Sequence, residues 1–166
     1  MISHNTMILF LKNLAFTILL PGTLAVYIPC RLLSPGFILP TDWALRHYVG
    51  LLPLLAGASI YAWCIWDFAT IGRGTPAPID APKVLVVHGL YCHVRNPMYL
   101  GVLLVITGWA VFFGSTTILL YAAAVWLGFH LFAIGVEEPS LRRRFAGSYV
   151  DYCRRVRRWL PGKGID

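Results

Sequence analysis

The chain has 166 residues, of which 58% are hydrophobic and 13% are charged, and its mean hydropathy is +0.68. Because a soluble domain carries roughly 25% charged residues, the composition argues against a soluble protein and indicates a single integral membrane domain over residues 1–166. The net charge is +7, and eight of the 14 lysines and arginines lie after residue 140. A basic tail beside apolar segments is typical of a cytoplasmic face on anionic lipid and argues against a nucleic-acid partner.

The first apolar segment predicts a membrane-spanning helix over residues 7–28. Lys12 lies near its start, where the long side chain can extend to the membrane surface. Pro21-Gly22 predicts a kink. No small-residue cleavage site follows the segment, so we interpret it as an anchor rather than a signal peptide.

The second apolar segment predicts a span over residues 48–68. Gly57-Ala58-Ser59 permits close helix packing. Trp63 and Trp66 lie near its end, as interfacial aromatic residues do.

An uncharged block of 40 residues follows, from Pro97 to Val136. About twenty residues cross the hydrocarbon core, so this block predicts two spans, 97–113 and 118–136, joined by a turn at Gly114-Ser115-Thr116-Thr117. The expected fold class is therefore all-α, a bundle of four transmembrane helices whose second half is a helical hairpin.

The connecting segments differ in charge. Residues 69–96 and the tail together contain eleven lysines and arginines, whereas the segment 30–47 contains two. The positive-inside rule places the basic side in the cytoplasm, and four spans place both chain termini there.

The tail, residues 137–166, predicts a basic amphipathic helix that lies on the membrane or caps the bundle and ends at Pro161. Apolar residues recur in it at three- and four-residue steps, with arginines between them. These apolar residues are Leu141, Phe145, Tyr149, Tyr152, Val156 and Trp159.

The predicted hairpin brings two polar motifs together. Each arm is about 17 to 20 residues long, or about 26 to 30 Å at 1.5 Å per residue. The second arm therefore returns Glu137-Glu138 to the surface at which Arg95-Asn96-Pro97 lies.

This group of residues has two interpretations. Asn96 and Pro97 suit the start of a helix, whose free N–H groups favour anions. With the charges of Arg95 and the two glutamates, and with the rings of Tyr91 and Tyr99, they suit a zwitterionic ligand that carries an aromatic ring. Alternatively, Arg95 is an anchor, Asn96-Pro97 a cap, and the glutamates neutralise the basic tail.

Two motifs resemble a known family. GLYCHVRNPMYLG and EEPSLRRRFAGSYVDYCRRVRRWLP are similar to the G-x-Y-x-x-x-R-[H/N]-P-x-Y-x-G and E-E-x-x-L-x-x-x-F-G-x-x-Y-x-x-Y motifs of the isoprenylcysteine carboxyl methyltransferase and phospholipid methyltransferase superfamily. Their order and the uncharged hairpin between them also match. The resemblance covers residues 74–161, including a proline-rich lead-in, TPAPIDAPKVLVVHGLY.

The resemblance implies an enzyme that transfers a methyl group from S-adenosylmethionine, bound on the cytosolic side, to a lipid-soluble or amphiphilic acceptor. It implies cofactor contacts by Lys83, Val84, Leu85, Val86, Tyr91, Asn96, Pro97, Met98, Tyr99 and Glu137. Arg95 and Glu138 are the candidate catalytic residues, since Glu138 could receive a proton from an amine acceptor. A carboxylate acceptor is already ionised, and carboxyl O-methylation is slightly favoured over phospholipid or amine N-methylation.

The sequence departs from the family pattern at three positions. Asn96 stands where many members have histidine. Ala146 separates Phe145 from Gly147, where the motif has a Phe-Gly step. Ala133 stands where the isoprenylcysteine branch has a substrate-binding arginine, which argues against a prenylcysteine substrate.

Two further classes of protein are weighed. A haem-binding electron carrier needs two histidines at matching depth, and only His130 lies inside a predicted span. A non-enzymatic membrane scaffold would bind no cofactor. The four cysteines form no CxxC pair and have no zinc-like spacing with histidine, so no metal site is predicted.

Overall fold

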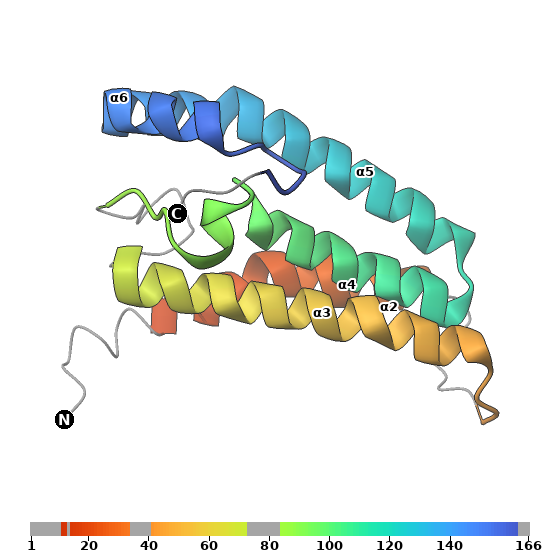
Figure 1. Ribbon diagram of the computed structural model, residues 1–166. Coiled ribbons are helices and arrows are strands. Elements are labelled where there is room, and N and C mark those ends of the chain that lie inside the picture. The colour runs from red at the N-terminus through yellow and green to blue at the C-terminus, as the bar shows by residue number, and fades with distance from the viewer. Residues whose placement is uncertain (1–10, 13, 34–40, 73–83, 163–166) are drawn as a thin grey trace, which may run out of the picture.

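The computed structural model describes residues 11–12, 14–33, 41–72 and 84–162, and within these ranges the chain is built of helices without a β-strand (Figure 1). The predicted all-helical class is therefore confirmed. Three helical stretches are long and apolar enough to cross a membrane, 14–32, 45–72 and 116–155, and Pro97–Phe113 is a shorter apolar helix. Lys83, residues 7–10 and 13 of the first predicted span, and residues 163–166 of the predicted tail lie outside the described residues.

The first span is not a regular α-helix around Pro21-Gly22, where a kink was predicted. It contains a π-helical stretch, η1 (Ile18–Tyr27), with Pro21 inside it, followed by α2 (Ile28–Leu32). Proline lacks the N–H that a regular helix interior needs, and the wider π turn is a common response to such a defect. The helix reaches Leu32, four residues beyond the predicted end, because Pro29 occupies the first turn of α2, where proline is tolerated.

The closest packing in the bundle joins α3 (Leu45–Asp67) to α4 (Pro97–Phe113). A β-carbon on Gly57 would lie 2.5 Å from the carbonyl oxygen of Gly101, and one on Gly108 would lie 2.8 Å from the backbone nitrogen of Leu54. The glycines thus let the two backbones touch, as in other membrane helix pairs. Ala58 and Ser59, predicted to share this role, are exposed instead, because they do not lie on the side of α3 that faces α4.

The hairpin turn is shorter than predicted. Gly114 adopts a φ of 63°, which favours glycine, and ends α4. Ser115 is the N-cap of α5 (Thr116–Phe132), and its side chain accepts a hydrogen bond from the backbone N–H of Ile118 at 3.3 Å. Thr116 and Thr117 therefore belong to the helix rather than to the turn.

Helix α5 passes without a break through a π turn, η5 (Ala133–Glu137), into α6 (Glu138–Arg155). The helical stretch 116–155 has 40 residues, interrupted at Ala146, and about twenty residues suffice to cross a hydrocarbon core of about 30 Å. Only the apolar half before Glu137 is suited to the membrane, and we treat α6, with its arginines, as lying outside it.

Helix α6 caps the bundle. The sequence left two placements open for this helix, on the membrane surface or as a cap, and the structure shows the cap. Tyr149, Tyr152 and Val156 are buried and pack against Leu85 and Val87. The helix ends at Arg155 rather than at Pro161, and at Ala146 the backbone leaves the helical conformation with a φ of 44°. Two shorter helical pieces can follow the surface of the bundle, which a straight helix cannot.

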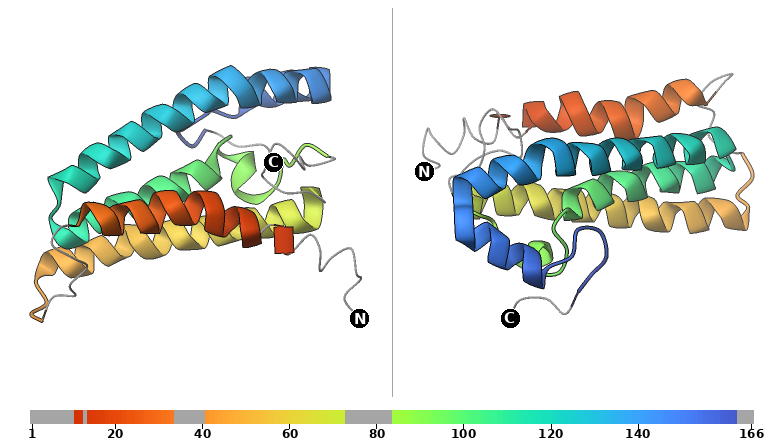
Figure 2. Two further views of the ribbon diagram at one scale, coloured as in Figure 1. Left: turned by 180° about the vertical axis from the view of Figure 1, so that it is seen from behind. Right: turned by 90° about the horizontal axis from the view of Figure 1, so that it is seen from above.

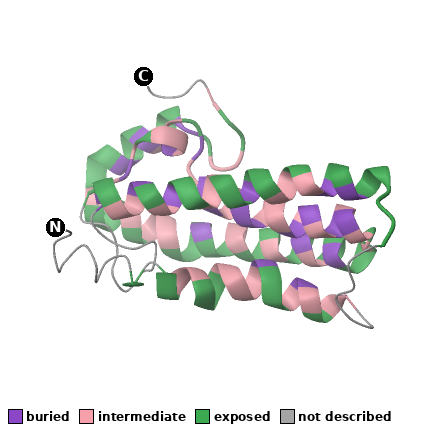
Figure 3. Ribbon diagram, turned by 90° about the horizontal axis from the view of Figure 1, so that it is seen from below, coloured by how far each residue is buried: buried purple, intermediate pink, exposed green. Residues whose placement is uncertain are grey.

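Successive helices of the bundle run in alternating directions (Figure 2). The start of the first span, the end of α3, the start of α4 and helix α6 share one end of the molecule. The α4–α5 turn and the start of α3 share the other. Exposed residues, many of them large and apolar, cover the outer helix surfaces, and the buried residues face inward (Figure 3).

Candidate functional site

The segment before α4 makes a tight turn that presents Tyr91. Gly89 has a φ of 54°, and a β-carbon there would lie 2.9 Å from Oδ2 of Asp67, so both its conformation and its surroundings require glycine. The short 3₁₀-helix η4 (Gly89–Cys92) follows. Burial raises the pKa of Tyr91 well above its ordinary value, so its hydroxyl stays neutral. Tyr152 of α6 donates a hydrogen bond of 2.7 Å to the carbonyl oxygen of Tyr91 and holds the turn under the cap.

Asn96 occupies the predicted N-cap position of α4, and Pro97 is at the predicted helix start. The Asn96 side chain, however, makes no capping hydrogen bond, and its Nδ2 atom is buried without a partner among the described residues. A buried N–H group without an acceptor is unfavourable by about 1–3 kcal/mol. Such a group in a native structure is a common sign of a ligand or water site.

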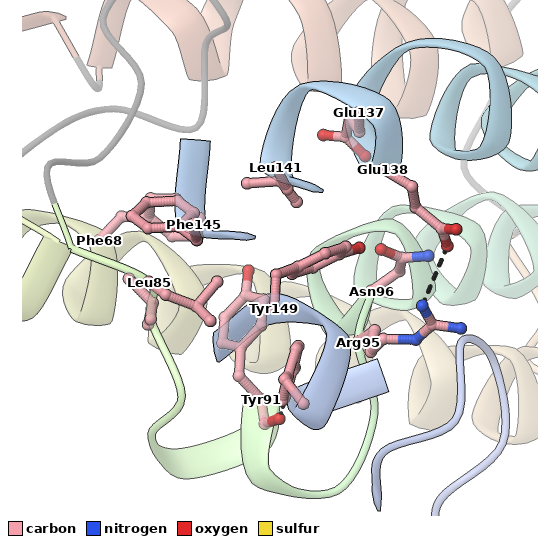
Figure 4. A pocket seen from close by; sticks show the side chains of 12 residues that line it. Phe68, Leu85, Tyr91, Arg95, Asn96, Glu137, Glu138, Leu141, Phe145 and Tyr149 are labelled. Atoms are coloured by element: carbon pink, nitrogen blue, oxygen red, sulfur yellow. Dashed lines mark hydrogen bonds and ion pairs between the residues drawn. The ribbon is translucent and has the colours of Figure 1, made fainter. Parts of the chain in front are cut away.

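Arg95 reaches the start of α6. Its Nη1 atom lies 3.2 Å from Oε1 of Glu138 and 2.9 Å from Sγ of Cys153. Figure 4 shows the contact between the Arg95 and Glu138 side chains, with Asn96 beside them. As the predicted hairpin requires, Arg95-Asn96 and Glu138 therefore lie together at one end of the bundle. The Nε atom of Arg95 is buried and, within the described part of the chain, has no acceptor.

Both oxygens of the Glu138 carboxylate accept hydrogen bonds from arginine side chains. Arg158 donates to both of its oxygens, at 2.7 Å to Oε1 and 3.1 Å to Oε2, and Arg95 also donates to Oε1. Burial alone would raise the pKa of this carboxyl group. The hydrogen bond from Arg158 and the positive charges of Arg95, Arg158 and Arg142 outweigh burial, and the pKa is lowered from its ordinary 4.5. Glu138 is therefore an ionised partner of arginines.

Glu137 has a different environment. The side chain of Tyr99 is its hydrogen-bond neighbour, and among the described residues no lysine or arginine forms an ion pair with it. Figure 4 shows its carboxyl group apart from the contact between Arg95 and Glu138. Two adjacent glutamates thus have separate surroundings.

Two adjoining cavities, of about 70 and 150 Å³, lie around these side chains. Both are lined by Phe68, Tyr91, Arg95, Asn96, Glu137 and Leu141. The smaller cavity adds residues of the lead-in and of α6, including Leu85, Phe145 and Tyr149. The larger adds apolar residues of the first span and of the hairpin, including Phe16 and Phe132. One cavity therefore lies under the cap, and the other extends between the membrane helices.

The structure brings most of the candidate site residues to these cavities. The residues at their walls are Leu85, Val86, Tyr91, Arg95, Asn96, Met98, Tyr99, Glu137 and Glu138. Val84 is 54% exposed and lines neither cavity, and Pro97 is buried at the start of α4 without lining them. Lys83 lies outside the described residues.

Several site residues were not foreseen. Phe68 lies just past the end of α3 and lines both cavities. The apolar stripe of the tail placed Tyr149 and Tyr152 on one face of a helix, but it did not predict that they reach a cavity. Asp67, a buried acid 3.6 Å from Nδ1 of His88, lies beside the Gly89 turn and lines neither cavity. It had a signal in the sequence, since an acidic residue at the end of an apolar span is costly unless paired.

The fold and the site together define a helical membrane protein in which polar side chains line two cavities at one end of the bundle. The sequence pattern of the phospholipid methyltransferase family matches residues 45–148, from the start of α3 into α6. This match covers more than half of the chain, which therefore belongs to that family of membrane methyltransferases. The predicted superfamily is thereby confirmed.

One relative is an uncharacterized protein of Haemophilus influenzae strain Rd. It is 35% identical to this chain over 63 residues, which are 38% of this chain and 100% of the relative. No solved structure matches the chain.

Proposed function

We propose that this protein transfers a methyl group from S-adenosylmethionine to a lipid-soluble acceptor, at the site where α4 begins and α5 passes into α6. The observation that supports this most strongly is a pair of buried N–H donors, Arg95 Nε and Asn96 Nδ2, that have no acceptor among the described residues. They line the same cavities as Glu137, which forms no ion pair with a lysine or arginine in the described part of the chain. The amino-acid end of S-adenosylmethionine is complementary to this arrangement. Its carboxylate suits the two donors, and its ammonium group suits Glu137.

When bound, S-adenosylmethionine supplies an electrophilic methyl group, which moves to the acceptor as the methyl carbon–sulfur bond breaks and its electron pair returns to sulfur. The protein's part is to position the reactants and exclude water. Tyr91, Phe68 and Phe145 offer flat apolar faces in the smaller cavity. Since ligand pockets commonly measure about 300–1,000 Å³, we expect α6 and residues 84–88 to move outward on binding.

The larger cavity is the proposed place of the acceptor. Apolar residues of the first span and of the hairpin line it, and its polar groups are those of Tyr91, Arg95, Asn96, Tyr99 and Glu137. We propose four spans with both termini in the cytoplasm, which places this cavity within reach of the lipid. An amphiphilic acceptor would then enter from the membrane and present its polar end to the site.

We favour carboxyl O-methylation over N-methylation. A carboxylate acceptor is ionised at neutral pH and needs no base, whereas an amine must lose a proton. Glu138 is poorly suited to accept that proton, because arginines engage both of its oxygens and lower its pKa. An amine acceptor would therefore depend on Glu137, and in this proposal Glu138 holds Arg95 in place.

The test is methyl transfer from S-adenosylmethionine with a labelled methyl group into a total lipid and small-isoprenoid extract. Mild alkali separates the two chemistries, since a methyl ester releases labelled methanol and an N-methyl group does not. We expect alkali-labile product from the wild-type protein and little from Asn96→Ala. Alkali-stable product would favour the amine acceptor, and no labelled product would contradict the enzymatic proposal.

A further inference from the structure

The chain after α6 forms a strap, residues 156–162, across the candidate site. The backbone N–H of Arg95 donates to the carbonyl oxygen of Arg157 at 2.9 Å, and the N–H of Gly162 donates to that of His93 at 3.0 Å. Trp159 donates from Nε1 to Nδ1 of His130 on α5 at 3.0 Å. The strap is therefore attached both to the segment before α4 and to the hairpin.

Arg158 of the strap connects it to the charged part of the site. Its two contacts with Glu138 use both carboxylate oxygens, and the shorter, 2.7 Å, is closer than the 3.2 Å contact that Arg95 makes with the same carboxylate. A bidentate arginine fixes the plane of a carboxylate, which a single contact cannot do. The orientation in which Glu138 meets Arg95 is thus set chiefly by Arg158.

An exposed ion pair would hold Glu138 in place only weakly, because such pairs contribute about 0–1 kcal/mol to stability. Here the side chains of Glu138 and Arg95 are only 12% and 13% exposed, and that of Arg158 is 25% exposed. Arg158 lines neither cavity, so it acts on the site through Glu138 and not by contact with a ligand.

We propose that Arg158 is a positioning residue for the candidate site: its bidentate contact with Glu138 fixes the carboxylate that holds Arg95 beside the cavities. The inference rests on the proposed binding of S-adenosylmethionine. It adds a requirement that the cofactor alone does not impose, namely that a residue of the strap sets the geometry of Arg95.

The test compares Arg158→Met with Arg157→Met. Both variants remove one positive charge from the strap, but the Arg157 side chain is exposed, and its backbone carbonyl, which Arg95 contacts, is retained. The measurement is the affinity for the demethylated cofactor, S-adenosylhomocysteine, from about pH 3.5 to 8. We expect Arg158→Met to bind about tenfold more weakly at neutral pH, the loss typical of a charge-assisted contact, and Arg157→Met to bind within about twofold of the wild type.

The pH profile separates positioning from a general loss of structure. The groups that face Glu138 are Arg95 before α4, Arg158 of the strap, and Arg142, Tyr149 and Glu137 of its own helical stretch. Arg158 helps to lower the pKa of Glu138 below its ordinary 4.5, so the charged form persists to lower pH than in a free glutamate. Without Arg158 the pKa of Glu138 rises. The loss of affinity on acidification, which is the acid limb of the plot of affinity against pH, should therefore begin at a higher pH. Arg158→Lys, which keeps the charge but not the bidentate geometry, should fall between the two.

Hydrogen exchange of the backbone amides of residues 93–96 gives a readout that needs no cofactor. We expect faster exchange there in Arg158→Met and wild-type exchange in Arg157→Met. If the wild-type protein binds no S-adenosylhomocysteine, the proposed function fails and exchange alone decides the role of Arg158. Unchanged affinity, acid limb and exchange in Arg158→Met, or equal losses in both variants, would overturn the inference. If Arg158→Met does not fold, Arg158→Lys carries the same comparison.

Discussion

At the scale of single residues, the two adjacent glutamates have separate roles because their neighbours differ. Glu138 faces two arginines and is held ionised. Glu137 has the hydroxyl of Tyr99 as its neighbour and lines both cavities. A basic tail that merely needed neutralising would pair with both glutamates alike. The separation favours a ligand with a positive group for Glu137.

The first prediction concerns the two residues proposed to hold the amino-acid end of the cofactor. Asn96→Ala and Glu137→Ala should each weaken binding of S-adenosylhomocysteine by about tenfold or more, because each removes a buried hydrogen-bonding group. Calorimetry on the purified protein measures this, with thermal unfolding as the check on folding. Ser59→Ala on the exposed side of α3 is the control. Wild-type affinity in both variants would contradict the assignment of Asn96 and Glu137 as cofactor-binding residues.

At the scale of elements, α6 has a break whose cause is local. Ala146, at the glycine position of the family's Phe-Gly step, adopts a φ of 44° and a ψ of −122°, which residues with a β-carbon rarely adopt. Such strain amounts to about 1–3 kcal/mol. The break lets the two pieces of α6 follow the bundle, and a glycine at this position would adopt it freely.

Ala146→Gly should therefore stabilise the protein, by about 1 kcal/mol, although glycine is normally unfavourable in a helix. The matched control is Gly147→Ala. No atom lies within 4 Å of a β-carbon there, and its φ is not in the left-handed range, so that change should be neutral or slightly favourable. Thermal unfolding in detergent compares them. A lower melting temperature for Ala146→Gly would show that the conformation is not strained.

The contact between α3 and α4 gives a second prediction at this scale. Gly57→Ala places a β-carbon 2.5 Å from the Gly101 carbonyl oxygen, so the helices must separate. We expect a loss of about 1–3 kcal/mol, as in other overpacked sites, seen as a lower melting temperature. Gly128→Ala on α5, where no atom lies within 4 Å, should not destabilise the protein. Equal melting temperatures for the two variants would contradict the close packing.

The sequence predicted the two arms and the turn of the hairpin, but it did not predict how α6 and the strap are arranged over the bundle. The uncharged stretch and Gly114 place the turn, and the arm lengths then bring Arg95 to Glu138, because helix rise is nearly constant. The position of Arg158 depends on two features that periodicity does not reveal, the break at Ala146 and the helix end at Arg155. Phe68 was missed since a phenylalanine at the end of an apolar span has no distinguishing signal.

At the scale of the whole molecule, charge and site share one end of the bundle. Arg95, Arg158 and the arginines of α6 lie there, and Arg46 lies at the other end, near the α4–α5 turn. This distribution predicts that the site faces the cytoplasm, where anionic lipid and S-adenosylmethionine are found.

The orientation is testable with single cysteines in a variant whose four native cysteines are replaced by alanine. Ser148 on α6 and Thr41 before α3 are both exposed. A membrane-impermeant maleimide added to intact cells should label Thr41→Cys and not Ser148→Cys, and inverted vesicles should give the reverse. Labelling of Ser148→Cys in intact cells would place the site on the outer face.

The central claim is that S-adenosylmethionine binds between the start of α4 and the α5–α6 junction. Calorimetric titration of the purified wild-type protein with S-adenosylhomocysteine, repeated with Glu137→Gln, tests it most directly. Glu137→Gln keeps the shape of the side chain and removes the charge proposed for the cofactor ammonium group. The account predicts saturable binding at one site by the wild type and about tenfold weaker binding by Glu137→Gln. Absence of binding by the wild type, or equal affinity in the two proteins, would contradict it.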